Sequence, residues 1–131
     1  MEPASSGTLA VPADVLVVED DPIIALHFED TILELGVKSV RCAASVAAAL
    51  AMIADRVPEF ALLDVGLVRE KSFAIAERLE ALKIPFAFVT GYAADVGVPA
   101  NFSNRPRLPK PFSSEALGAL LNNHAGGLAD S

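Results

Sequence analysis

Side chains suited to binding a metal ion or a phosphoryl group each stand at the end of a short run of the sequence that is expected to form a strand. They are Glu19, Asp20, Asp64, Thr90 and Lys110. Carboxylates gathered at one place repel one another, so stability alone would not favour them there. A hard divalent cation such as Mg²⁺ resolves this conflict, because it takes oxygen ligands and commonly keeps several waters beside one or two carboxylates.

The same residue types suit phosphoryl transfer, in which negative charge spreads over three equatorial oxygens. A metal ion, the Thr90 hydroxyl and the Lys110 ammonium can each stabilise one of these oxygens. The nucleophile would then be a carboxylate oxygen, a covalent role that Asp takes in other proteins. The alternatives are a solvated strand end for Glu19 and Asp20 and a surface position for Lys110. The presence of all these groups in one chain favours a site that binds a metal ion and a phosphoryl group over these two alternatives.

Short runs that are apolar at every position predict the strands that must hold these groups. Residues 15–18, 60–63 and 86–89 are typical of strands buried on both faces. Ser39–Ala43 is weaker and predicts a strand near an edge, in which Val40 and Cys42 could point inward. A short fifth strand at Arg107–Pro109 is inferred mainly from its position.

Helical spacing of apolar residues predicts helices between these strands. Asp21 precedes Pro22 and is interpreted as a helix N-cap rather than a third metal ligand, and Gly36 ends the same helix. Residues 93–105 contain Gly97, Pro99, Asn101 and Asn104, so a helix there is expected to be short or irregular. The apolar faces of the other helices are Ile24, Phe28, Ile32 and Leu35; Val46, Ala49, Leu50 and Ile53, opened by Ser45; Phe73, Ala76, Leu79 and Leu82; and Ala116, Leu117, Leu120 and Leu121, opened by Ser113 or Ser114.

This alternation predicts an α/β fold with a doubly wound, five-stranded parallel sheet and helices on both faces. In such sheets the functional site lies beyond the carboxyl ends of the strands, near the topological switch point. We expect a flexible N-terminal lead at residues 1–12, one domain at 13–124 and a C-terminal tail at 125–131.

Four motifs together resemble the receiver domain of two-component response regulators (the CheY-like fold), in order and in spacing. They are Val-Val-Glu-Asp-Asp-Pro at 17–22, Leu-Leu-Asp-Val-Gly-Leu at 62–67, Val-Thr-Gly-Tyr at 89–92 and Pro-Lys-Pro-Phe at 109–112. The resemblance implies that Asp64 is the phosphoacceptor and that Thr90 and Lys110 bind the phosphoryl group. It also implies a cis peptide bond before Pro111.

The resemblance further implies a Mg²⁺ site, with Mn²⁺ as an alternative ion. Asp20 and Asp64 would bind the metal directly and Glu19 through water. The backbone carbonyl of Gly66 would be the third protein ligand.

Residues 85–92, Pro-Phe-Ala-Phe-Val-Thr-Gly-Tyr, are similar to the signature of the FATGUY receivers, a mostly alphaproteobacterial group. Val89 stands where the signature has Ala. The similarity implies a sensor histidine kinase of the HWE type, or a histidine phosphotransferase, as the upstream partner, and a further protein downstream. Thr90, Gly91, Tyr92 and the segment 93–105 are expected to form the switch, because movement of Thr90 toward the phosphoryl group would pull on the residues that follow it, and 93–105 is rich in helix breakers. Arg107 occupies the place of the usual aromatic switch residue and cannot play that part.

The formal net charge of -7 argues against nucleic acid and anionic membranes as partners. The sequence has no transmembrane stretch or signal peptide, and Cys42 is its single cysteine, so we expect a cytoplasmic protein without disulfides. We expect a monomer or weak homodimer that has no output domain and acts through protein partners. We also expect a phosphoacceptor that assists its own phosphorylation and dephosphorylation, not an enzyme with a separate substrate.

Three other functions fit the residues less well. A phosphatase of the haloacid dehalogenase type needs a second Asp where this chain has Gly66, and a flavodoxin needs a phosphate loop where it has Glu-Asp-Asp-Pro. A pseudo-receiver, acting only by interaction, would not need the complete set of site residues. His27 could suggest a phosphohistidine, but its place in an apolar helical pattern favours a structural role.

Overall fold

The structure is a computed structural model that describes residues 11–64, 72–90, 107–109 and 112–122. It contains a five-stranded parallel sheet in the order β2-β1-β3-β4-β5. The strands are β1 (Asp14–Val18), β2 (Ser39–Ala43), β3 (Phe60–Asp64), β4 (Phe86–Thr90) and β5 (Arg107–Pro109). The helices are α2 (Pro22–Glu34), α3 (Val46–Asp55), α4 (Ser72–Ala81) and α5 (Ser114–Asn122). The predicted fold class is confirmed.

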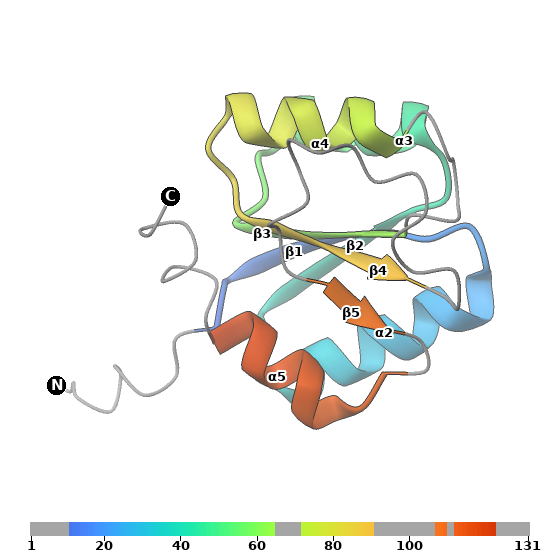
Figure 1. The fold of residues 1–131 in the computed structure, drawn as a ribbon, viewed down its shortest axis with the longest axis vertical. Coiled ribbons are helices and arrows are strands. Elements are labelled where there is room, and N and C mark those ends of the chain that lie inside the picture. Colours follow the sequence, from blue (N-terminus) through green and yellow to red (C-terminus); the bar gives the residue numbers. More distant parts are fainter. Residues whose placement is uncertain (1–10, 65–71, 91–106, 110–111, 123–131) are drawn as a thin grey trace, which may run out of the picture.

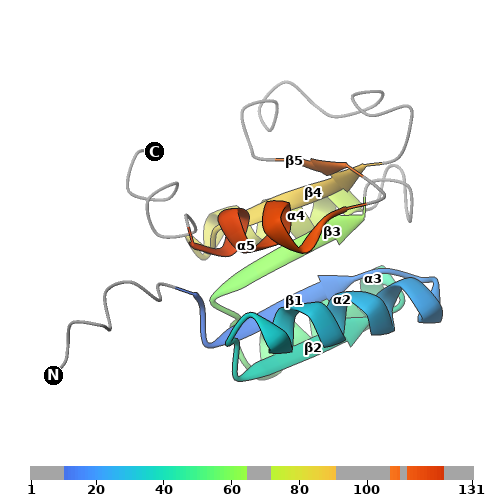
Figure 2. The ribbon, with the colours of Figure 1, turned by 90° about the horizontal axis from the view of Figure 1, so that it is seen from below.

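The helices form two layers, one on each face of the sheet. Helices α2 and α5 cover one face, and α3 and α4 cover the other (Figures 1 and 2). The chain runs outward from β1 through α2 to β2, then returns through α3 to β3 on the other side of β1. The topological switch point therefore lies between β1 and β3, where an α/β sheet places its site.

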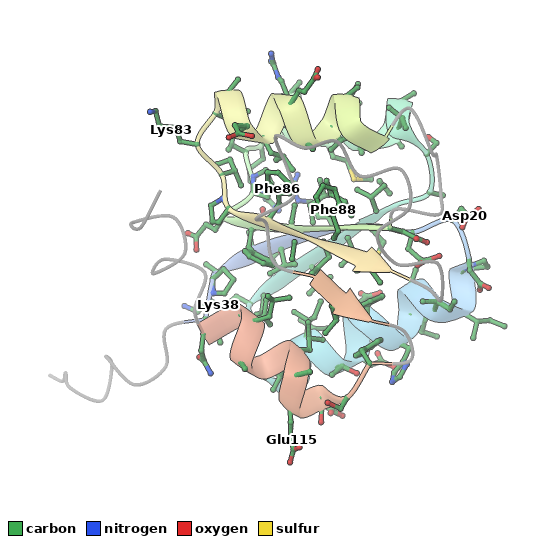
Figure 3. The ribbon with its side chains drawn as sticks, viewed as in Figure 1. Asp20, Lys38, Lys83, Phe86, Phe88 and Glu115 are labelled. Carbon is green, nitrogen blue, oxygen red and sulfur yellow. The ribbon has the colours of Figure 1, made fainter. Side chains whose placement is uncertain are left out.

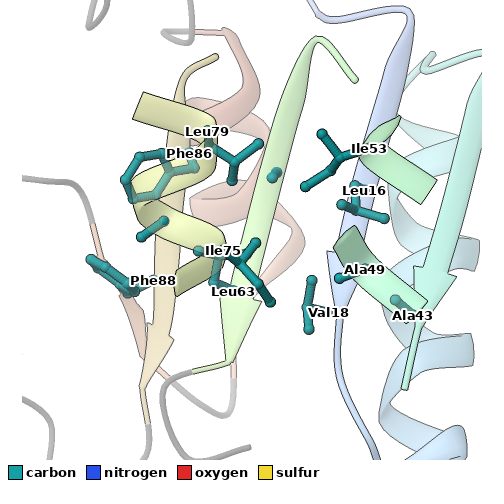
Figure 4. Packing of buried hydrophobic residues seen from close by; sticks show 12 residues of the cluster. Leu16, Val18, Ala43, Ala49, Ile53, Leu63, Ile75, Leu79, Phe86 and Phe88 are labelled. Atoms are coloured by element: carbon teal, nitrogen blue, oxygen red, sulfur yellow. The ribbon is translucent and has the colours of Figure 1, made fainter. Parts of the chain in front are cut away.

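Burial on both faces explains why the inner strands β1, β3 and β4 are apolar at both alternations over most of their length. In β1, Leu16 and Val18 join the core beneath α3 and α4, whereas Val15 and Val17 join the core beneath α2 and α5. Figure 4 shows the first of these cores, in which Phe86 and Phe88 of β4 extend the packing. Successive side chains of a strand point to opposite faces, so an inner parallel strand needs apolar residues at both alternations.

Side-chain caps begin three of the helices. The Asp21 carboxylate accepts hydrogen bonds from the backbone N–H groups of Ile23 (2.9 Å) and Ile24 (3.3 Å) at the start of α2. Ser45 caps α3, and Ser113, of the two serines considered, caps α5. Caps of this kind satisfy N–H groups that have no partner within the helix. The predicted cap role of Asp21 is confirmed.

The predicted apolar face of α4 needs a correction. The buried residues are Ile75, Ala76 and Leu79. Leu82 lies beyond the helix end at Ala81 and is 37% exposed, because the chain turns there toward β4. The side chain of Phe73 lies outside the described part of the chain.

Two further predictions fall on residues that the structure does not describe. They are the irregular helix at 93–105 and the cis bond before Pro111. Among the residues that are described, no helix combines the length and the apolar character needed to cross a bilayer.

Candidate functional site

Glu19 and Asp64 lie at the ends of the two strands that flank the switch point. Val18 is in register with Leu63, so the residues that follow them in the chain are at the same level of the sheet. The Glu19 N–H donates to the Ala43 carbonyl at 2.9 Å, which continues the β1–β2 ladder one residue beyond β1. Strand pairing thus fixes the backbone of both acidic residues.

The three carboxylates of Glu19, Asp20 and Asp64 form one cluster. Each offers an oxygen, and these oxygens all lie within 4.8 Å of one another. Glu19 and Asp64 are only 3% and 5% exposed, whereas Asp20 is exposed. Figure 3 shows Asp20 at the end of the molecule toward which β4 and β5 point. Clustered carboxylates of this kind are suited to a hard cation, which would offset their mutual repulsion.

Asp21 has a different role from its neighbour Asp20. Its side chain is engaged at the start of α2, and its own backbone N–H donates to Glu19 Oε2 at 3.2 Å. The two bonds hold the loop on either side of Asp20. Asp20 is therefore presented at the site by a fixed strand end and a fixed helix start.

The ends of β4 and β5 lie at the same edge of the sheet. Asp64 is in register with Val89, and Thr90, the next residue, is in register with Pro109. Lys110 follows Pro109 directly in the sequence. The backbone register therefore brings Thr90 to the site edge as predicted. The Thr90 side chain lies outside the described part of the chain, as do the other predicted site and switch residues: Gly66, Gly91, Tyr92, Lys110 and Pro111.

Two reactive residue types lie outside the acidic cluster. His27 is exposed on α2, and its ring stacks with that of Phe112. Cys42 is half-buried, and its Sγ lies 3.9 Å from the Ala25 carbonyl oxygen. Burial, and to a lesser extent the Glu29 carboxylate, raises the pKa of the Cys42 thiol above its usual value. The thiol therefore stays protonated near neutral pH, as expected of a packing residue.

Sequence reasoning missed a charged network near the start of β1. The Arg41 guanidinium binds the Asp14 carboxylate and also donates to the backbone carbonyls of Met52 (3.0 Å) and Arg56 (2.9 Å). It thereby gives the Met52 carbonyl a second donor beside the Arg56 N–H (3.0 Å), and it supplies a donor to the Arg56 carbonyl just beyond the end of α3. The signal in the sequence was an arginine in the middle of the edge strand Ser39–Ala43, between Val40 and Cys42.

Known proteins resemble this chain in sequence and in structure. The sequence is 31% identical over 110 residues to the sensory transduction protein LytT of Enterococcus faecalis (strain ATCC 700802 / V583), covering 82% of this chain and 46% of LytT. The solution structure of SdrG from Sphingomonas melonis Fr1 superposes with a TM-score of 0.72 at 37% identity, covering 89% of this chain and 96% of SdrG. The PhyR stress response regulator gives a TM-score of 0.74 at 26% identity, covering 92% of this chain and 47% of PhyR. No protein-family model matches the sequence.

The fold is a doubly wound α/β domain, and a cluster of three carboxylates that could hold a cation lies at its switch point. Together with these similarities, they establish that the chain belongs to the receiver domains of response regulators. It spans about half the length of LytT and of PhyR, and nearly all of SdrG.

Proposed function

We propose that the chain is a phosphorylation switch in which Asp64 accepts a phosphoryl group in a Mg²⁺-dependent reaction. The observation that carries this proposal is the Asp64 carboxylate, buried at the end of the middle strand and clustered with Glu19 and Asp20. A carboxylate held in a site of this kind meets its reaction partner in a fixed orientation.

The donor set of the cluster fits Mg²⁺. It consists of oxygen ligands only, which is what this ion prefers, and Mn²⁺ would fit the same ligands. We assign direct binding to Asp20 and Asp64, binding through water to Glu19, and the third protein ligand to the Gly66 carbonyl. A bound Mg²⁺ supplies positive charge against the charge that develops on the phosphoryl oxygens.

The proposed reaction transfers a phosphoryl group from a phosphohistidine to Asp64. A carboxylate oxygen attacks phosphorus, a P–O bond forms, and the P–N bond breaks with its electron pair left on the imidazole nitrogen. The Thr90 hydroxyl and the Lys110 ammonium stabilise the equatorial oxygens. The chain is then a phosphoacceptor that assists its own phosphorylation and dephosphorylation, rather than an enzyme that acts on a separate substrate.

The partner that supplies the phosphoryl group is proposed to be a histidine kinase, of the HWE type, or a histidine phosphotransferase. Exposed apolar residues at the start of α2 support a protein as the donor. This apolar stripe begins at Ile23, two residues after Asp21, and therefore lies close to the acidic cluster. Ile23 and Leu26, which are three residues apart, are 78% and 56% exposed. Leu33 is also exposed, about two turns further along the helix and beyond the exposed Asp30. The similarity of residues 85–92 to the FATGUY signature supports the kinase type. We propose that the phosphorylated chain then binds a downstream protein.

SdrG has been solved in a BeF3-activated conformation and is 43% identical over 83% of this chain. Beryllofluoride imitates a phosphoryl group on a carboxylate. By analogy, we propose that this chain also has an activated conformation, reached when Asp64 is modified.

Labelling with a small phosphodonor tests the assignment of Asp64. The chain should gain one phosphoryl group from acetyl phosphate in the presence of Mg²⁺, and chelation of the metal should prevent the gain. Asp64→Asn should abolish labelling, whereas Asp30→Asn, at an exposed position of α2, should label like the wild type. Intact-mass spectrometry is the measurement. Equal labelling of the Asp64→Asn chain would refute the assignment.

A further inference from the structure

Helix α2 and the loop before it carry acidic residues and no basic ones. From Glu19 to Val37 the sequence has no lysine and no arginine. Apart from His27, the ionisable residues of this stretch are Glu19, Asp20, Asp21, Glu29, Asp30 and Glu34. All of them except Glu19 are exposed or half-buried. The surface that α2 presents to solvent therefore has charge of one sign.

These carboxylates do not stabilise the helix that carries them. Asp30 and Glu34 are four residues apart, a spacing at which like charges on a helix repel each other. Glu34 is the last residue of α2, where the helix dipole favours a cation. In the part of the chain that the structure describes, no lysine or arginine forms an ion pair with either carboxylate. A role outside the helix accounts for charges that its own stability disfavours.

The acidic side chains border the exposed apolar residues of α2. Leu26 and Leu33, which are 56% and 42% exposed, are seven residues apart and lie on one line along the helix. Glu29 and Asp30 follow Leu26 by three and four residues, so they lie on the two sides of this line. From Ile23 to Leu33 the apolar residues span about 15 Å along the axis. An elongated apolar centre with a charged rim is suited to docking a helix of another protein.

We propose that the partner that docks on α2 does so with a helix whose apolar residues are flanked by lysine or arginine. Its apolar residues pack on Ile23, Leu26 and Leu33, and its cations lie against the surrounding carboxylates. Complementary charge speeds the encounter of two proteins and disfavours partners of the wrong sign. A second copy of this chain would bring the same negative surface to α2 and is disfavoured for that reason. The inference rests on the function proposed above, because this partner is the phosphodonor, and it adds the sign of charge by which the donor is recognised.

Two synthetic peptides of about 20 residues serve as probes, because isolated helices shorter than about 12–15 residues are marginal in water. Both carry leucine along one face, and the flanking positions are lysine in one peptide and glutamate in the other. Binding to the whole 131-residue chain is followed by the amide NMR shifts. The lysine peptide should shift the amides of α2, and the glutamate peptide should not. Raising the ionic strength from about 0.05 to about 0.5 M should weaken the binding about fivefold or more.

Charge reversal separates this surface from the net charge of the chain. The double variant Asp30→Lys, Glu34→Lys should bind the lysine peptide about tenfold or more weakly and should gain affinity for the glutamate peptide. The double variant Asp55→Lys, Glu77→Lys changes the net charge equally, at exposed positions of α3 and α4 on the other face of the sheet. It should bind both peptides like the wild type. Both variants should be labelled by acetyl phosphate and Mg²⁺, since none of these residues belongs to the site.

The outcomes separate this inference from the proposed function. Equal binding of the two peptides, unchanged binding after the α2 charge reversal, or shifts that cluster away from α2 would each overturn the basic partner and leave phosphorylation of Asp64 intact. Absence of binding by the lysine peptide at about 1 mM would overturn it as well. Absence of labelling of the wild type by acetyl phosphate would refute the phosphoacceptor function, and with it the identity of the partner as a phosphodonor.

Discussion

At the scale of single residues, two adjacent carboxylates illustrate how the local backbone determines chemistry. Asp20 contributes an oxygen to the acidic cluster, whereas the carboxylate of Asp21 accepts the first N–H groups of α2. The side chains are identical, and the difference lies in where the strand ends and the helix begins. A carboxylate at a helix N-cap is already satisfied and gains little from binding a cation.

Substitution of Asp20 should therefore lower the Mg²⁺ affinity, and substitution of Asp21 should lower the folding stability. Asp20→Asn should weaken Mg²⁺ binding by about tenfold or more without loss of folding stability, because it removes a ligand and relieves repulsion. Asp21→Ala should bind Mg²⁺ nearly as well as the wild type but lose about 1 kcal/mol of unfolding free energy with its cap. Isothermal titration and urea denaturation measure the two effects. The assignment of roles would be wrong if both variants lost Mg²⁺ affinity equally.

Arg41 is a second residue whose role is set by its surroundings. Arg41→Met should lower the unfolding free energy by about 1–3 kcal/mol, because it leaves the mostly buried Asp14 carboxylate with only the exposed Arg56 side chain at 3.6 Å. It also removes one hydrogen-bond donor from each of the Met52 and Arg56 carbonyls. The range is discounted for the partial exposure of the Arg41 and Asp14 side chains, 16% and 12%. Phosphorylation should not change, because the network is at the start of β1, far along the strand from Glu19.

Lys38→Met is the matched control for this substitution. Lys38 is exposed and precedes β2, so its replacement should leave stability within about 0.5 kcal/mol of the wild type. Urea denaturation and acetyl phosphate labelling should be measured on both variants. A loss of labelling in Arg41→Met at temperatures where it is folded would show that the network and the site are coupled.

At the scale of elements, α2 and α4 end in the same backbone motif with different residues. Beyond α2, Val37 and Gly36 donate to the carbonyls of Ile32 and Leu33, and Gly36 has φ +108°. Beyond α4, Ile84 and Lys83 donate to the carbonyls of Leu79 and Glu80, and Lys83 has φ +61°. These are Schellman motifs, which require a left-handed residue after the helix, a conformation that costs an L-residue about 1–2 kcal/mol.

Exchanging the residue type at these positions should change stability in opposite directions. Gly36→Ala should lower the unfolding free energy by about 1 kcal/mol, entirely through the backbone, because an added Cβ would lie 3.8 Å from Val11 Cγ2 at ordinary contact distance. Lys83→Gly should raise it by about 0.5 kcal/mol, because relief of strain exceeds the added freedom of the unfolded chain. Denaturant midpoints provide the measurement. Destabilisation by Lys83→Gly would mean that its side chain contributes more than its backbone costs.

At the scale of the whole molecule, the two ends of the sheet have different surfaces. The carboxyl end carries the acidic cluster and, directly beyond it, the exposed apolar residues at the start of α2. Lys38 and Lys83 lie at the opposite end (Figure 3). A protein that delivers a phosphoryl group to Asp64 must approach the first end, where burial of apolar surface can stabilise the complex.

The apolar stripe should matter for a protein donor and not for a small one. Ile23→Asp should slow phosphotransfer from a cognate kinase or phosphotransferase by about tenfold or more, because it buries a charge in the complex. Its rate with acetyl phosphate should stay at the wild-type value, since Ile23 is 78% exposed and takes no part in the core. Val57→Asp, at an exposed apolar position that precedes β3, is the control and should leave both rates unchanged. Equal transfer to both variants would exclude the stripe as the docking surface.

The sequence by itself determined the fold class, the strand positions and the backbone placement of Glu19, Asp20 and Asp64. Two of the signals are local: runs that are apolar at successive positions indicate inner strands, and capping residues such as Asp21 indicate helix starts. The third is a general rule of parallel sheets, in which the carboxyl ends of the strands meet at one edge. The roles of Gly66, Lys110, Pro111 and the switch at Thr90, Gly91 and Tyr92 stay predictions, as do the cytoplasmic location and the lack of an output domain.

Only the tertiary structure decided the contacts between residues distant in sequence. The Asp14–Arg41 pair joins positions 27 residues apart, and the stack of Phe112 on His27 joins α2 to the chain after β5. Leu82 fits the helical spacing of its neighbours but lies exposed beyond the end of α4. The left-handed residue that ends this helix is Lys83, and the sequence has no glycine there to indicate it. Periodicity reports which face of one element is apolar, whereas a pairing between elements depends on how they pack, and packing is fixed only when the whole core forms.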